Sequence, residues 1–101
     1  GSEDEFIEDE ADVLETSIYP NPATENVSIN YGFDADATVN IDVYDTSGRR
    51  VRSLENNKTV YEGELNTSTF SVSDLNAGLY IITIISSNGD SETHRLMIGN
   101  R

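Results

Sequence analysis

The chain has 101 residues and is strongly acidic, with a net charge of −13 from 19 aspartates and glutamates against 6 lysines and arginines. This length fits one domain around a single core, and the charge argues against nucleic acids and anionic membranes as partners, since both are polyanions. The sequence has no cysteine, which excludes disulfides and thiolate chemistry, and no apolar run near the roughly 20 residues of a membrane span, so we expect no membrane insertion.

The first part of the chain differs in composition from the rest. Residues 1–16 carry eight of the acidic side chains and few large apolar ones. Because such a block repels itself and buries little apolar surface, we predict an acidic linker or disordered tail. The dipeptide Gly1-Ser2 is typical of residues left by cloning. The folded domain is predicted to span residues 17–101.

A proline-rich corner begins the predicted domain. Ile18 and Tyr19 suit a short edge strand, which ends at Pro20 and Pro22 because proline has no N–H donor. Asn21 precedes a proline and is therefore restricted to extended geometry. We expect Pro20-Asn21-Pro22 to form a rigid corner where the linker meets the domain.

Two alternating segments follow. Apolar and polar residues alternate in residues 26–33 and again in residues 38–45, which predicts two antiparallel strands with one buried face. The residues expected on the buried face are Val27, Ile29, Tyr31, Phe33, Val39, Ile41 and Val43. Residues 34–37 form the connecting turn. A second turn is predicted at residues 46–48, with Gly48 at positive φ.

The middle of the chain is more polar. Residues 49–54 predict a strand with a bulge, because Val51 and Leu54 break the alternation. We expect a polar loop at residues 55–58, a weak strand at residues 59–65 and a further strand at residues 67–73.

The same region holds the one basic cluster of the sequence. Its members are Arg49, Arg50, Arg52 and Lys58. The cluster favours a charged sheet edge that discourages aggregation, and a docking patch is the alternative.

The most apolar stretch comes next. Residues 74–78 contain turn formers and Gly78, which is expected at positive φ, with Leu75 and Tyr80 as further structural residues of the motif. Residues 79–85 are too short for a typical helix and predict a central strand covered on both faces. The Asn88-Gly89 pair predicts a hairpin turn, and residues 91–98 the last strand. Seven or eight short strands without a helical period predict an all-β protein, an antiparallel β-sandwich.

Catalytic and metal-binding patterns are weak. The one histidine, His94, falls in a predicted strand and is expected to be structural or solvent-facing, so we expect no enzyme activity. Several aspartates near turns offer the oxygen ligands that Ca²⁺ prefers, but they match no EF-hand spacing. These residues are Asp34, Asp36, Asp42, Asp45, Asp74 and Asp90. We expect turn-forming and solubilising roles for them and no cofactor, with calcium as the alternative.

Four motifs, in order and ending at the C-terminus, resemble the type A C-terminal sorting domain of the type IX secretion system of Bacteroidota. The motifs are Tyr19–Pro22 followed by Val27–Ile29, then Val43–Val51, then Leu75–Ile84, and then the closing strand. The resemblance covers residues 17–101. It implies an immunoglobulin-like β-sandwich that acts as an address for an upstream cargo domain in the same chain.

The resemblance also implies a route and partners. The cargo would pass through the periplasm and the outer membrane to the cell surface or medium, where a surface peptidase usually cuts the domain off and the cargo is anchored. The implied partners are the secretion translocon and that peptidase. We hypothesise that the last strand is part of what the translocon or the peptidase recognises, through Thr93, His94, Arg95, Leu96, Met97 and Ile98, while Pro20-Asn21-Pro22 and Gly48 hold shape.

Two alternatives remain open. A carbohydrate-binding or adhesive module would present aromatic side chains, and the chain has five tyrosines but no tryptophan. The tyrosines are Tyr19, Tyr31, Tyr44, Tyr61 and Tyr80, several of which the alternation places in or near the core. The other alternative is an immunoglobulin-like spacer domain of a surface protein.

Overall fold

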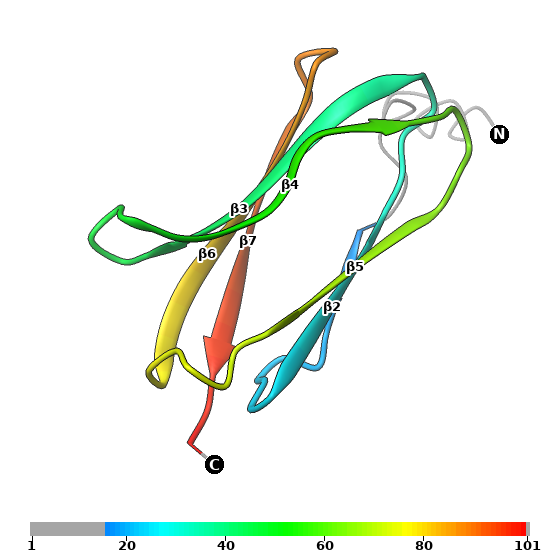
Figure 1. Ribbon diagram of the computed structural model, residues 1–101. Helices are drawn as coiled ribbons and strands as arrows, with labels where there is room; N and C mark the ends of the chain where they lie inside the picture. Colours follow the sequence, from blue (N-terminus) through cyan, green and yellow to red (C-terminus); the bar gives the residue numbers. More distant parts are fainter. Residues whose placement is uncertain (1–15, 101) are drawn as a thin grey trace, which may run out of the picture.

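The computed structural model describes residues 16–100 and shows two packed antiparallel sheets (Figure 1). The smaller sheet has the order β1-β2-β5 and is built from β1 (Ser17–Tyr19), β2 (Asn26–Tyr31) and β5 (Asn66–Ser71). The larger has the order β4-β3-β6-β7, from β3 (Ala37–Asp45), β4 (Arg50–Val60), β6 (Gly78–Ser86) and β7 (Ser91–Ile98). The predicted all-β, immunoglobulin-like sandwich is confirmed, with seven strands. No helix in the described part is long and apolar enough to cross a membrane.

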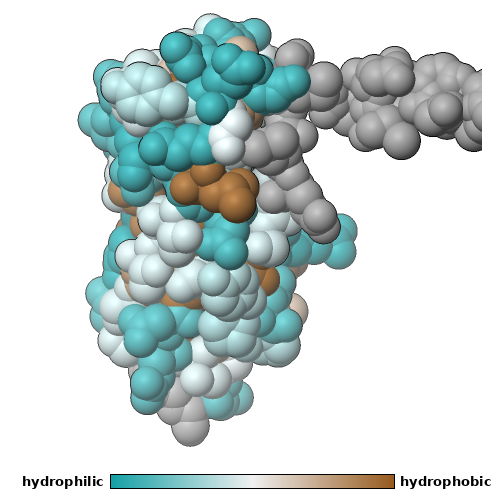
Figure 2. All heavy atoms as spheres, turned by 90° about the vertical axis from the view of Figure 1, so that its right-hand side faces the viewer, coloured by the Kyte–Doolittle hydropathy of each residue, from teal (hydrophilic) through white to brown (hydrophobic). Residues whose placement is uncertain are grey.

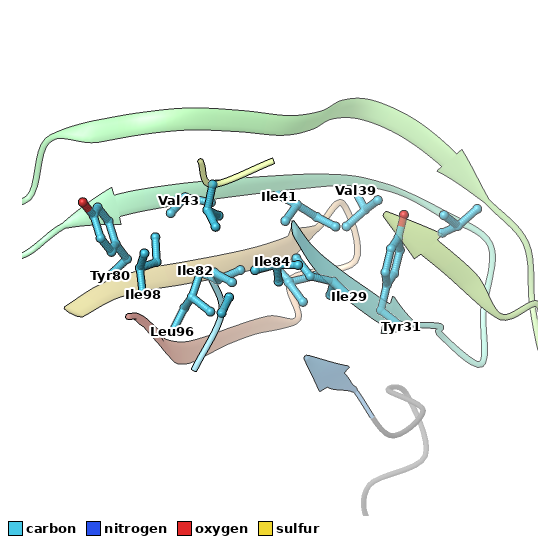
Figure 3. Close-up of a cluster of buried hydrophobic side chains, with 14 of the residues drawn as sticks. Ile29, Tyr31, Val39, Ile41, Val43, Tyr80, Ile82, Ile84, Leu96 and Ile98 are labelled. Carbon is cyan, nitrogen blue, oxygen red and sulfur yellow. The ribbon is translucent and has the colours of Figure 1, made fainter. Parts of the chain in front are cut away.

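The core lies between the two sheets and is formed by the alternating apolar positions (Figure 3). All seven residues expected on the buried faces of the first two long strands are at most 2% exposed. The larger sheet adds Ile82, Ile84, Leu96 and Ile98, also at most 2% exposed. Burial of this apolar surface, at roughly 25 cal/mol per Å², is the main force that joins the layers.

The outer face of the smaller sheet is polar. Ser28 lies 3.0 Å from Thr69 between hydroxyl oxygens, and the Thr67 hydroxyl donates to Asn30 Oδ1 at 2.8 Å. The side of the molecule that carries β2 and β5 is accordingly mostly hydrophilic (Figure 2). This sheet therefore turns one apolar face to the core and a neutral polar face to water.

The structure corrects the prediction for residues 55–65. The expected polar loop at 55–58 lies inside one long strand, β4, and residues 61–65 connect it to β5 instead of forming a strand. Three register shifts between β3 and β4 accommodate the polar residues, and the Asn57 N–H donates to Asn40 Oδ1 at 2.8 Å. Because β4 is an edge strand, its polar side chains reach water without a burial cost. The bulge expected near Val51 is confirmed.

The prediction that residues 79–85 are covered on both faces is wrong. Ile82 and Ile84 are buried in the core, whereas Ile85 is 47% exposed. β6 does occupy an interior position in its sheet, between β3 and β7. A two-layer sandwich, however, has no third layer to cover the outer face of that sheet.

Adjacent residues of β6 provide a test of this arrangement. We expect Ile84→Ala to lower the free energy of unfolding by about 2–5 kcal/mol, because it leaves a cavity in the core. Ile85→Ala, the matched control on the outer face, should cost less than about 1 kcal/mol. Urea denaturation followed by circular dichroism measures both values. Equal losses for the two variants would contradict the two-layer assignment.

Tyr31 carries a polar group into the core. Its ring packs edge-on against Phe33 at 6.5 Å between centroids, and its buried hydroxyl has no hydrogen-bond partner in the described part of the chain. Burial, with smaller contributions from the charges of Glu55 and Glu64, raises the pKa of Tyr31 to about 12. The phenol is therefore held in its neutral form in the folded state.

This pKa predicts how stability changes at alkaline pH. The unfolded chain loses the Tyr31 proton near pH 10.0 and the folded chain near pH 12, so stability should fall as the pH rises through this window. We expect Tyr31→Phe to weaken this decline and to cost little stability at neutral pH, because no hydrogen bond is lost. Urea unfolding at pH 7 and at several values above 10 tests this. An unchanged alkaline decline in the variant would assign the effect to other groups.

Candidate functional site

The motifs that carried the resemblance meet at one end of the sandwich. β2, β4 and β6 begin at this end, and β3, β5 and β7 finish there. We call the loops at this end, residues 20–25, 45–49, 72–78 and 98–100, the motif end. The chain enters β1 at the other end, because Ser17 pairs with Asn30 near the finish of β2. The two ends of the described chain thus lie at opposite ends of the sandwich.

The Asn21 side chain binds the backbone of β7. Its Oδ1 accepts the Met97 N–H at 2.9 Å, and its Nδ2 donates to the Arg95 carbonyl oxygen at 3.1 Å. The backbone of Ala23 continues the pairing, since its N–H donates to the Met97 carbonyl at 2.9 Å and its carbonyl accepts from Gly99 at 2.8 Å. We call these four bonds the edge clamp. They occupy the outer edge of β7 from the Arg95 carbonyl to Gly99.

The short segment on either side of the proline corner pairs with strands of both sheets. Ile18 pairs with Ile29 in the smaller sheet, whereas Ala23 bridges Ile98 of the larger sheet in parallel. The peptide bonds before Pro20 and Pro22 are both cis. The sequence predicts a corner here. The sequence does not indicate which strand Asn21 contacts, because Arg95, the nearer in sequence of its two β7 partners, lies 74 positions away.

The turn between β3 and β4 is organised by Asp45. Its Oδ1 accepts hydrogen bonds from the Ser47 hydroxyl at 2.6 Å, the Ser47 N–H at 2.9 Å and the Arg49 N–H at 3.1 Å. The Ser47 hydroxyl, and then the Arg49 N–H, hold the pKa of the Asp45 carboxyl below its usual value. Gly48 has a φ of 92°, as predicted, which favours glycine over residues with a Cβ.

The loop before β6 lies beside this turn. The Tyr80 hydroxyl donates to the Asn76 carbonyl at 2.7 Å, Leu75 packs against the core, and Gly78 has the expected positive φ, 146°. A cleft of about 460 Å³ separates the loop from the Asp45 turn. A second cleft lies between residues 75–77 and Gly99-Asn100. The loop is thus open to contact on two sides, one of them beside the C-terminal residues.

The predicted recognition strand divides into two sets. Thr93, Arg95 and Met97 point outward and are exposed, with Met97 at 43%. Leu96 and Ile98 point into the core, so a receptor cannot contact their side chains in the folded domain. His94 is half-buried and its Nε2 lies 2.7 Å from Glu92 Oε1. The six residues of the hypothesis therefore reduce to three that a partner can reach fully.

The basic cluster lies on and beside the edge strand β4, as the charged-edge prediction implies. Each of its three arginines forms an ion pair with an aspartate. The pairs are Arg49–Asp45 at 3.4 Å, Arg50–Asp42 at 3.7 Å and Arg52–Asp74. This local neutralisation makes the docking-patch alternative less favourable.

The calcium alternative and the tyrosine alternative rest on the aspartates near turns and on the five tyrosines. No group of three or more acidic or histidine side chains within residues 16–100 is arranged to hold a metal ion. Calcium binding at these aspartates stays a prediction. Tyr19 and Tyr61 are 47% and 56% exposed. Tyr19 is the last residue of β1, and its hydroxyl accepts a hydrogen bond from Asn30 Nδ2 at 3.2 Å, whereas Tyr61 follows β4. Carbohydrate binding by these tyrosines stays a prediction.

Comparisons with known proteins give a family and a fold. The family model described as secretion system C-terminal sorting domain matches residues 17–99. No curated protein matches the chain. The crystal structure of dimeric latent PorU from Porphyromonas gingivalis is similar, at 21% identity and a TM-score of 0.67, over 89% of this chain. The match spans 9% of the PorU chain.

A second solved structure is CopC from Methylosinus trichosporium OB3b. It has 14% identity and a TM-score of 0.51, and the match covers 88% of this chain and 93% of CopC. At these identities both likenesses establish the sandwich fold and nothing further.

The edge clamp can be tested by shortening Asn21. We expect Asn21→Ala to lower the free energy of unfolding by about 1–3 kcal/mol, because two hydrogen bonds to β7 are lost. Asn21→Asp keeps an oxygen for the Met97 N–H but places a second carboxylate oxygen against the Arg95 carbonyl, where two acceptors repel, so this variant should also be less stable than the parent. Urea denaturation measures stability, and hydrogen exchange of the Met97 amide reports the clamp directly. Unchanged protection of that amide in Asn21→Ala would contradict the assignment.

Proposed function

The chain belongs to the family of secretion system C-terminal sorting domains, that of the type IX system, and we propose that its motif end is the address that the export machinery reads. In this proposal the domain directs an upstream cargo in the same chain through the outer membrane. It is then cut off by a surface peptidase, and the cargo is anchored at the cell surface. The domain itself performs no reaction.

The proposal rests on the positions of the two ends of the described chain, which lie at opposite ends of the sandwich. The motifs and residues 98–100 lie together at the motif end, while the chain enters at the far end through Ser17. A cargo placed before residue 17 would therefore sit away from the motif end and leave it open. A rigid sandwich with loops fixed at one end suits a surface that is recognised by shape.

The surface proposed to be read combines loop and strand residues. It comprises the outward residues Arg95 and Met97 of β7, the loop at residues 75–77 and the exposed corner at Asn21. The edge clamp holds the corner against β7, so these parts keep a fixed relative position. A partner can recognise such a composite surface only when the domain is folded. The proposed signal is therefore a folded surface and not a linear sequence.

The proposal predicts that residues 17–101 are sufficient for export. Fused behind a periplasmic reporter in a bacterium with a type IX system, the domain should bring the reporter to the cell surface. Accessibility of the reporter to protease added to whole cells measures this outcome. Retention of the reporter in the periplasm would contradict the proposal and favour a spacer domain.

Paired variants locate the address. Arg95→Glu with Met97→Glu should reduce surface exposure of the reporter to that of the reporter without the domain, because both changes alter the outward face of β7. Thr67→Glu with Thr69→Glu adds the same two side chains to the outward face of β5 and should leave export intact. Circular dichroism of the purified variants confirms that each is folded. Equal export by the two pairs would remove β7 from the proposed surface.

A further inference from the structure

The larger sheet has two edges of very different character. β4 has three register shifts against β3 and carries Arg50, Arg52 and Lys58, and bulges and charges of this kind discourage another strand from pairing. β7 pairs with β6 from Ser91 to Ile98 without any register shift. β7 therefore presents the regular edge, on which an added strand can pair.

The edge clamp closes only half of this edge. Since Met97 bonds outward to Asn21 and Ala23, the alternation of an antiparallel ladder directs the backbone groups of Arg95, Thr93 and Ser91 outward as well. Within residues 16–100, the N–H and carbonyl groups of Ser91 and Thr93 and the N–H of Arg95 have no backbone partner. The open part of the edge thus runs from Ser91 to Arg95.

The side chains on this open part are complementary to themselves in one register. If a second copy pairs antiparallel with Thr93 opposite Thr93, then Glu92 faces His94 of the second copy, and His94 faces Glu92. A shift toward the C-terminus places His94 opposite His94 and requires the Met97 edge, which the clamp occupies. A shift the other way places Glu92 opposite Glu92. Like charges opposite each other destabilise strand pairs, so only the Thr93-centred register is favoured.

We propose that residues 91–95 of β7 form a self-association edge, on which a second copy of the chain adds around a twofold axis at Thr93. Ser91, Thr93 and Arg95 exchange backbone hydrogen bonds with Arg95, Thr93 and Ser91 of the second copy. The two larger sheets become one continuous sheet across the dimer. The edge clamp sets the extent of the overlap, because it blocks pairing beyond Arg95. The proposal is independent of the export function.

Sedimentation of the full chain gives the first test. Over concentrations up to about 1 mM, a range that captures weak association, the mass should rise from 11.1 kDa to twice that value. Thr93→Pro removes an N–H that points away from β6, so it should keep the chain at 11.1 kDa while the β6–β7 pairing remains. A chain that stays monomeric throughout overturns the proposal and leaves the edge to a different protein.

Single cysteines test the register, since the chain has none of its own. Opposed Thr93 residues would lie about 5.5 Å apart between Cα atoms, within disulfide range. Oxidation of Thr93→Cys should therefore cross-link the dimer rapidly. Ser91→Cys is the matched control, because its two copies would lie about 13 Å or more apart along the strands. Cross-linking of Ser91→Cys as fast as Thr93→Cys would refute this register.

Charge variants separate the contact between copies from the Glu92–His94 contact within one copy. Glu92→Lys alone and His94→Glu alone lose the internal pair. The first places a lysine opposite His94 and leaves no carboxylate acceptor across the axis, and the second places a glutamate opposite Glu92, so each should stay monomeric. When the two variants are mixed, the lysine introduced in one faces the glutamate introduced in the other, and the unchanged His94 faces the unchanged Glu92. A heterodimer should therefore form. A mixture that stays monomeric while the parent dimerises, or a single variant that dimerises like the parent, would assign the dimer to another surface.

Discussion

The structure depends on the closure of β7, an edge strand whose side chains complete the core. Leu96 and Ile98 are buried between the sheets, so β7 must stay in place for the core to exist. On one side it is held by the full ladder to β6, and on the other by the Asn21 amide and the backbone of Ala23. An asparagine side chain has the same donor and acceptor as a peptide group, so it extends the sheet without a further strand. The first and last folded segments of the chain are thereby joined.

Much of the fold was predictable because alternation states directly which side chains face the core. Val27 to Tyr31 and Val39 to Val43 repeat every second residue, and both strands were found as expected. Residues 55–58 were wrongly predicted to be a loop, because composition alone does not distinguish a polar loop from a polar edge strand with bulges. Residues 79–85 were wrongly predicted to be covered on both faces, because their apolar composition does not show that the sheet has no outer layer, and Ile85 is exposed there.

The site was less predictable than the fold. The backbone geometry of the turns was predictable from the local sequence. Positive φ values were expected at Gly48 and Gly78 and are found there, and Gly89 of the predicted Asn88-Gly89 turn also has a positive φ. The role of Asn21 depends on a partner at the other end of the sequence, and no local pattern records such a contact. The meeting of the motifs at one end also follows from strand order, which sequence patterns leave open. Residues 1–15, expected to be part of an acidic linker, lie outside the described residues.

The placement of Ser17 and Asn100 at opposite ends has a mechanical consequence. If the motif end is held by a receptor and a polypeptide is pulled from the Ser17 side, tension runs along the strands and not across them. Backbone hydrogen bonds in an antiparallel pair are perpendicular to the strands, so such a pull shears the bonds of β1 together instead of opening them one at a time. With three residues, β1 is the shortest link in that path, and the Asn21 amide is the next anchor along it.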